Sequence, residues 1–129
     1  MREILFRGKS VDNGVWLYGE FLSTKNYAQI WVDRDDGKWN YLVDKSTVGQ
    51  YTGLKDKNGV KIFEGDILES RYDEKHHDDM CYEVVMWHDN GWCTQEEGCA
   101  DRDHLSEDDM LKYSEVIGNI HDNPELMEV

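Results

Sequence analysis

The clearest local indication of the fold is the segment Leu54-Lys55-Asp56-Lys57-Asn58-Gly59-Val60-Lys61-Ile62-Phe63. Two short extended runs, residues 54–56 and 61–63, flank the dipeptide Asn58-Gly59. This dipeptide readily supplies two residues with positive φ, as a type I′ turn requires. The stretch therefore predicts a tight β-hairpin.

Similar short runs recur along the whole chain between Gly and Asn breaks, and long amphipathic helices are absent, so we expect a mainly β protein. An opening hairpin turns at Asp12-Asn13-Gly14. Further strands are expected over residues 15–21, 27–32, 39–43, 67–72, 81–87, 92–94 and 115–121. Residues 73–79 have no apolar member and should form an exposed loop, and residues 95–104 are acidic and irregular. Residues 107–113 and a turn beginning at Pro124 are the two candidate short helices.

The length of 129 residues fits one compact domain, or two small β units that share a core. Residues 44–53 have turn chemistry with one short extended piece, and they form the only candidate seam. We therefore expect an N-terminal β subdomain over residues 1–52 and a C-terminal subdomain over residues 53–129.

The charge is strongly polarised. The net charge is −14, with ten basic and eight acidic side chains in residues 1–61 but four and twenty in residues 62–129. Such a balance argues against a passive binder of nucleic acid or of an anionic membrane.

No apolar run approaches the ~18 residues that span a bilayer, so we expect a soluble, cytoplasmic protein with no membrane partner. The three cysteines, an odd number, are expected to be reduced thiols.

Four segments in the same order resemble the YopX family of phage and prophage proteins. They are Arg2-Glu3-Ile4-Leu5-Phe6-Arg7-Gly8-Lys9, Gly14-Val15-Trp16-Leu17-Tyr18-Gly19, Thr47-Val48-Gly49-Gln50-Tyr51-Thr52-Gly53-Leu54-Lys55-Asp56-Lys57-Asn58-Gly59 with Ile62-Phe63-Glu64-Gly65-Asp66-Ile67, and Val116-Ile117-Gly118-Asn119-Ile120-His121-Asp122-Asn123-Pro124-Glu125-Leu126. Residues 23–45 and 68–113 match poorly and resemble variable insertions.

The resemblance implies a small N-terminal β unit and a C-terminal barrel of SH3 type, encoded by a phage or a prophage. It implies no reaction. The motif glycines Gly49, Gly53, Gly59, Gly65 and Gly118 have a structural interpretation, since tight turns and close strand contacts exclude a Cβ atom. Asp66 is expected to accept backbone N–H groups and to fix the turn into the next strand.

Sequence patterns typical of catalytic or metal-binding sites are weak in this chain, and no catalytic, cofactor-binding or metal-binding residue is assigned. His76, His77, His88, His104 and the three cysteines lack the spacing of zinc sites. Cys81 and Cys93 lie on opposite arms of one predicted hairpin, where free buried thiols that lie near each other are the favoured interpretation. Residues 33–37 fail the requirements of a calcium loop and predict a hairpin turn. No nucleophile elbow or phosphate loop is present, so we expect a protein that is not an enzyme and has no cofactor.

Three functions remain open. The first is a non-enzymatic interaction module that contacts another protein or a second copy of the chain. The second is a nucleic-acid-binding regulator, which the charge disfavours, and the third is a metal-dependent enzyme. The second function would use a basic face near Trp16 or Tyr51. The cations of this face are Arg2, Arg7, Lys9, Lys55, Lys57 and Lys61.

Overall fold

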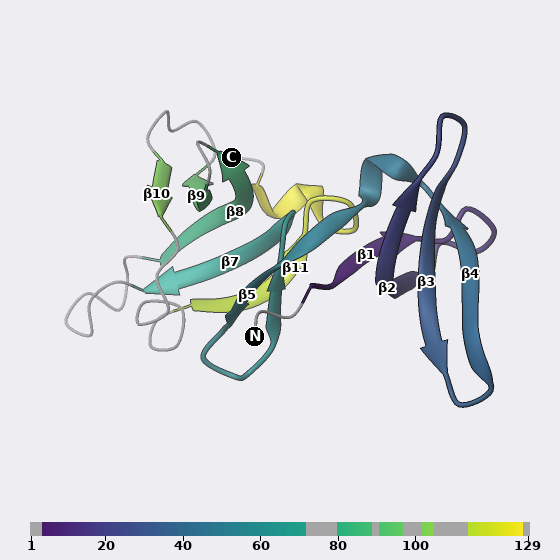
Figure 1. Ribbon diagram of the computed structural model, residues 1–129. Helices are drawn as coiled ribbons and strands as arrows, with labels where there is room; N and C mark the ends of the chain where they lie inside the picture. The colour runs from purple at the N-terminus through teal and green to yellow at the C-terminus, as the bar shows by residue number, and fades with distance from the viewer. Residues whose placement is uncertain (1–3, 72–79, 89–90, 97–101, 105–113, 128–129) are drawn as a thin grey trace. The chain divides into compact units, whose positions relative to one another are not determined.

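The computed structural model describes residues 4–71, 80–88, 91–96, 102–104 and 114–127. Strands dominate these ranges, which confirms the expectation of a mainly β protein (Figure 1). The chain divides into two compact units, residues 1–51 and residues 52–129. Within the described ranges, no helix has the length and apolar character needed to cross a membrane.

The N-terminal unit is an antiparallel meander. Its strands are β1 (Phe6–Lys9), β2 (Trp16–Ser23), β3 (Ala28–Arg34) and β4 (Gly37–Val43), in the spatial order β4-β3-β2-β1. Strand side chains alternate between faces, so each strand offers every second residue to one side. One face carries Ala28, Ile30 and Val43, which form the buried cluster of this unit. Phe6 and Phe21 pack against this cluster and meet edge to face at a centroid distance of 5.5 Å.

The two ends of this meander meet at a single bridge. Ser10, just after β1, pairs with Val43 at the end of β4. The N–H of Asp44 donates to the carbonyl of Lys9 at 2.8 Å, and the N–H of Val11 donates to the carbonyl of Leu42 at 3.1 Å. The outer edge of β4 is therefore hydrogen-bonded at its C-terminal end.

The connection after β4 is more regular than predicted. A 3-10 turn, η1 (Lys45–Thr47), is capped by Asp44, whose side chain accepts the N–H of Ser46. Strand β5 (Gly49–Lys55) follows, and its first residues pair with β1. The expected short extended piece is thus a full strand, because β1 offers it a pairing edge that local turn chemistry does not reveal.

The C-terminal unit begins within β5. Its further elements are β6 (Lys61–Phe63), β7 (Asp66–Arg71), β8 (Met80–His88), β9 (Gly91–Glu96), β10 (Arg102–His104), β11 (Ser114–Asn119) and the 3-10 turn η2 (Pro124–Met127). β6 neighbours β5, and the other strands form an antiparallel sheet in the order β10-β9-β8-β7-β11. Ile62, Leu68 and Val85 form the core of this unit.

The expected SH3-type barrel is not found as a closed structure. In the described part of the chain, β10 and β11 end the five-stranded sheet and do not pair with each other. Strand β10 lies within residues 95–104, which we expected to be irregular, so that expectation was wrong. Its three residues lack apolar alternation, and the pairing with β9 supplies the order. The expected loop over 73–79 and the expected helix over 107–113 lie outside the described residues.

The hairpin between β5 and β6 exists, but its turn is not the predicted one. The N–H of Gly59 donates to the carbonyl of Asp56 at 3.0 Å, so Lys57 and Asn58 are the central residues. Gly59 follows with a φ of 82°, and the N–H of Asp56 donates to the carbonyl of Val60 at 2.9 Å. This is a three-residue loop that ends in a glycine with positive φ, rather than a two-residue type I′ turn.

Asp56 sets the position of that turn. It is 1% exposed, and its Oδ1 accepts the N–H groups of Asn58 at 2.8 Å and Val60 at 2.9 Å. Its Oδ2 accepts the N–H of Val116 in β11 at 2.9 Å. Because one carboxylate holds both the loop and a distant strand, the turn begins at Asp56, one residue before the place that the Asn-Gly signal indicates.

Two other motif residues behave as predicted. The carboxylate of Asp66 accepts the N–H of Phe63 at 2.7 Å across the turn into β7. Gly118 lies at a register shift between β11 and β7, and a Cβ atom there would stand 2.5 Å from Oδ1 of Asn123. Both observations confirm the structural interpretation of these positions.

Candidate functional site

The structure brings together part of the predicted basic face. Lys9 is directly opposite Trp16 and Arg7 is opposite Tyr18 in the pairing of β1 with β2. The guanidinium of Arg7 lies 4.7 Å from the centroid of the Trp16 ring, and the ammonium of Lys9 lies 5.5 Å from it. Both distances are in the range of cation–π attraction. Arg7 is only 6% exposed, so its charge is largely hidden from a ligand in solution.

The remaining predicted cations do not belong to the described part of the N-terminal unit. Arg2 lies outside the described residues. Lys55, Lys57 and Lys61 belong to the C-terminal unit, where Lys57 pairs with Glu115 at 3.7 Å. Tyr51 is 6% exposed and cannot offer its ring to a ligand.

The N-terminal sheet has a second face that carries aromatic and apolar side chains. The register places Trp16, Tyr18, Leu22, Trp31 and Leu42 on the face opposite to the buried cluster. Tyr18, Leu22 and Leu42 are each between 44% and 48% exposed. We call this side of the sheet the outer face. Large apolar groups at such exposure on one side of a sheet are typical of an interaction surface.

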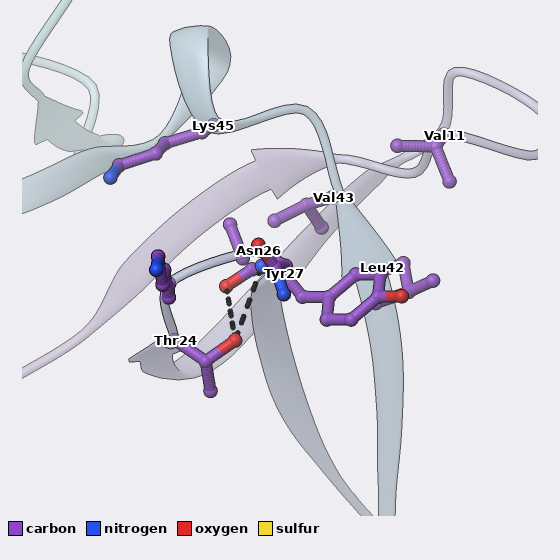
Figure 2. Close-up of a pocket in the computed structure, with 9 residues that line it drawn as sticks. Val11, Thr24, Asn26, Tyr27, Leu42, Val43 and Lys45 are labelled. Carbon is purple, nitrogen blue, oxygen red and sulfur yellow. Dashed lines mark hydrogen bonds between the residues drawn. The ribbon is translucent and has the colours of Figure 1, made fainter.

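A pocket opens at the loop end of the same unit (Figure 2). Its volume is about 400 Å³. Its lining comes from three segments that meet at this end of the meander, namely Val11, Thr24, Lys25, Asn26, Tyr27, Ala28, Leu42, Val43 and Lys45. Among these described residues there are two lysines and no carboxylate. The pocket therefore suits an apolar group attached to a negative charge.

Backbone and side-chain hydrogen bonds fix the loop that forms one wall. The N–H of Thr24 donates to the carbonyl of Tyr27 at 2.8 Å. Its Oγ1 accepts the N–H of Tyr27 at 3.1 Å and donates to the carbonyl of Tyr27 at 3.3 Å, as the dashed lines in Figure 2 show. Figure 2 shows the ring of Tyr27 directed toward Leu42. The pocket is thus walled by a closed turn and by a strand end that Val11 holds in place.

The sequence did not point to this pocket. Tyr27 and Leu42 were expected only as strand residues, since alternation shows which face a side chain shares and not whether that face is covered. The exposure of Tyr27, at 58%, appears only in the folded unit. The available signal was a lysine two positions from an apolar residue in each of two connecting segments, Lys25 with Tyr27 and Lys45 with Val43.

The predicted turn over residues 33–37 is confirmed. Arg34 pairs with Gly37 across Asp35 and Asp36, and Oδ1 of Asp36 accepts the indole N–H of Trp39 at 2.8 Å. This carboxylate thus has a local structural partner, as a hairpin turn requires.

The structure does not bring Cys81 next to Cys93, and its described residues contain no metal-binding cluster of histidines and cysteines. Cys93 pairs with Met86 of β8, whereas Cys81 lies five positions earlier in that strand. That offset along the backbone is roughly 17 Å at the rise of an extended chain, so the expectation that the two cysteines lie near each other across the hairpin was wrong. Within the described residues, no group of three or more His, Cys, Asp or Glu side chains is arranged to hold a metal ion. His76 and His77 lie outside those residues.

Comparison with known proteins places the chain in a family without indicating a reaction. The family model described as YopX protein matches residues 5–128, nearly the whole chain, so the chain belongs to that family. A comparison with curated proteins finds no match. Among solved structures, the crystal structure of protein EF1440 from Enterococcus faecalis is similar, with a TM-score of 0.65 and 24% sequence identity. The match covers 99% of this chain and 100% of that chain. At this identity the likeness concerns the fold.

Proposed function

We propose that this member of the YopX family, which we take to be of phage or prophage origin, is a non-enzymatic protein-interaction module. Its binding surface is the loop-end pocket of the N-terminal unit together with the neighbouring outer face. The partner is a protein that presents an apolar side chain next to one or more carboxylates.

The distribution of exposed apolar side chains carries this proposal. Among the described residues, the large exposed hydrophobic side chains of residues 1–51 are Ile4, Val11, Val15, Tyr18, Leu22, Tyr27, Trp39 and Leu42. The described side chains of the C-terminal unit contribute four more. Aromatic anchors beside cationic groups are the composition that concentrates binding energy in protein interfaces.

The charges at the pocket favour a protein partner over a nucleic acid. Residues 1–51 hold seven basic and seven acidic side chains, so the unit has no net positive field to attract phosphates over a distance. Lys25 and Lys45 instead act locally, within the lining of one apolar pocket. Two lysines at such a pocket match one acidic side chain, or a short acidic run, that flanks an apolar anchor.

A nucleic-acid regulator is the second candidate, and one observation favours it. Lys9 lies against Trp16, and the neighbouring Tyr18 is 46% exposed, so a base could stack beside a cation there. Band shifts with single-stranded and double-stranded DNA and RNA at ~50 mM salt test this candidate, and a retarded band should weaken steeply as salt rises. No retarded band at low salt would eliminate it.

The test of the main proposal compares matched surface variants. The full chain and the double variant Tyr27→Ser/Leu42→Ser are used to capture proteins from a bacterial host lysate, and the captured protein is then purified and titrated by calorimetry. We expect the double variant to bind at least roughly tenfold more weakly, since each residue is an exposed anchor of the pocket. Val60→Ser is the control, because Val60 is 48% exposed but belongs to the C-terminal unit. No retained protein, or equal binding by both variants, would contradict the proposal.

A further inference from the structure

Strand β4 is an outer strand of the N-terminal sheet, and its hydrogen-bonding pattern identifies which backbone groups remain available. It pairs with β3 on one side only, from Arg34↔Gly37 to Ala28↔Val43. On the other side, Leu42 accepts from Val11 and Asp44 donates to Lys9. In an antiparallel strand both polar groups of a residue point to the same side, and this side alternates along the chain. The outward groups of β4 therefore belong to Lys38, Asn40 and Leu42.

Two of these three residues remain open for pairing. The bond from Val11 occupies the carbonyl of Leu42. Within the described residues, no hydrogen bond reaches the backbone N–H or carbonyl of Lys38 or Asn40 on that side. Residues 37–40 are all exposed, so the edge is accessible over the segment that contains both. An accessible edge of this kind is a template for an added strand.

We propose that this edge pairs with the same edge of a second copy of the chain, antiparallel and centred on Trp39. Centring the two-fold axis on Trp39 places Lys38 opposite Asn40 of the second copy and Asn40 opposite Lys38 of the second copy. Both are hydrogen-bonded pairs, so all the open groups of the edge are satisfied at once. The result is one continuous sheet through two N-terminal units.

The alternative registers are less favourable for identifiable reasons. An axis at Lys38 would put two ammonium groups directly opposite each other, which is destabilising in a strand pair. An axis at Asn40 would place Lys38 against Leu42 of the second copy, where Val11 already takes the carbonyl. The register on Trp39 is the one that uses both open residues and opposes no like charges.

The side chains at the proposed axis suit this register. The indole of Trp39 is 49% exposed, and its N–H is already bonded to Asp36, so burial of the ring leaves no donor without a partner. Residues opposite each other in the non-hydrogen-bonded positions come closest, which brings the two Trp39 rings together. The ammonium of Lys38 lies 3.1 Å from Glu20 of the same chain, and this contact moderates its charge at the seam.

The charges at the two ends of β4 are complementary. The acidic turn with Asp35 and Asp36 precedes the strand, and Lys45 follows its other end, where Lys25 also lines the pocket. Antiparallel pairing directs the acidic turn of each copy toward the lysine-bearing end of the other. The N-terminal unit is neutral overall, so repulsion between copies comes from residues 52–129, with seven basic and twenty-one acidic side chains. Salt should therefore strengthen the dimer.

Light scattering and sedimentation of the full chain, from micromolar to millimolar protein, test this inference. We expect a concentration-dependent dimer. Asn40→Pro removes one outward N–H and is compatible with an edge strand, so it should weaken the dimer roughly tenfold or more. Asn40→Ala keeps the backbone and should dimerise like the wild type.

A second pair of variants protects the test against misfolding of the proline variant. Trp39→Glu places two carboxylates opposite each other at the axis and should give a monomer, whereas Trp39→Phe should retain the dimer. In the wild type, the amides of Lys38 and Asn40 should exchange with deuterium more slowly as protein concentration rises. A wild-type monomer at all concentrations, or a dimer that Asn40→Pro and Trp39→Glu leave intact, would overturn the inference. A monomer would leave the pocket in place, because all of its lining residues belong to one chain.

Discussion

Replacement of Asp56 offers a sharp test of how the C-terminal unit is held together. The carboxylate accepts three backbone N–H groups, two within the loop and one from Val116, sixty positions away in the chain. Asn58 and Val60 are exposed residues of the loop, so we expect water to replace the carboxylate at their N–H groups when it is removed. Val116 is a half-buried residue, so we expect water to reach its N–H less readily.

The expected magnitude follows from these three bonds. A hydrogen bond to a charged acceptor contributes about 1.5–3 kcal/mol, and a bond that water can replace contributes near the lower end or less. Asp56→Ala should therefore lower the free energy of unfolding by about 3 kcal/mol. Asp56→Asn should lower it by about 1–2 kcal/mol, because one amide oxygen can serve either the loop or β11 but not both.

Urea unfolding followed by near-ultraviolet circular dichroism measures both variants. The control is Asp44→Asn, which keeps one acceptor oxygen for the exposed Ser46 and should change stability by less than about 0.5 kcal/mol. Deuterium exchange should accelerate at the amide of Val116 in Asp56→Asn. Equal urea midpoints for Asp56→Asn and Asp44→Asn would refute the reasoning.

The remaining predictions concern close contacts and a surface ion pair. Gly118→Ala should destabilise the protein by about 1–3 kcal/mol, because the new Cβ would meet Asn123, and the loss should shrink when Asn123→Ala is added; urea unfolding of the single and double variants checks this. Gly19→Ala should reduce the yield of folded protein, because its Cβ would overlap the carbonyl of Trp31 in the paired strand β3; circular dichroism and solubility report the outcome. The hydrogen bond and the charge of Glu20 raise the pKa of Lys38, so Glu20→Gln should lower that pKa in an NMR titration. The pair stabilises the folded state fully below the ordinary lysine pKa, and this stabilisation disappears as the pH rises through the raised pKa of Lys38. An unchanged Lys38 titration would show that the contact is not maintained in solution.

Local sequence signals located most strands but not all of their boundaries. The runs around Trp16, Ile30 and Val85 alternate strongly, and each lies in a strand as predicted. Strand β5 was expected only as short extended pieces and the short β10 was missed, because their order comes from pairing partners distant in the sequence. Turn chemistry found the loop after β5, but the carboxylate of Asp56 moved it by one residue.

The candidate site was only partly accessible to sequence reasoning. Proximity of Lys9 to Trp16 could be expected from one hairpin, and the structure places them together. The pocket around Tyr27 and Leu42 needed three segments to converge, and spacing within any single segment contains no information on that convergence.

The family, the β class and the uneven charge could be inferred from the amino-acid sequence, because each of these depends on composition or on neighbours a few positions apart. The folded structure was needed to show which apolar side chains stay uncovered and which backbone groups of β4 remain open. Those properties depend on whether a distant strand or loop, such as Ser10 and Val11 against Val43 and Leu42, arrives to cover them. Coverage is a property of packing in three dimensions, whereas alternation along a strand specifies only the side to which a residue points.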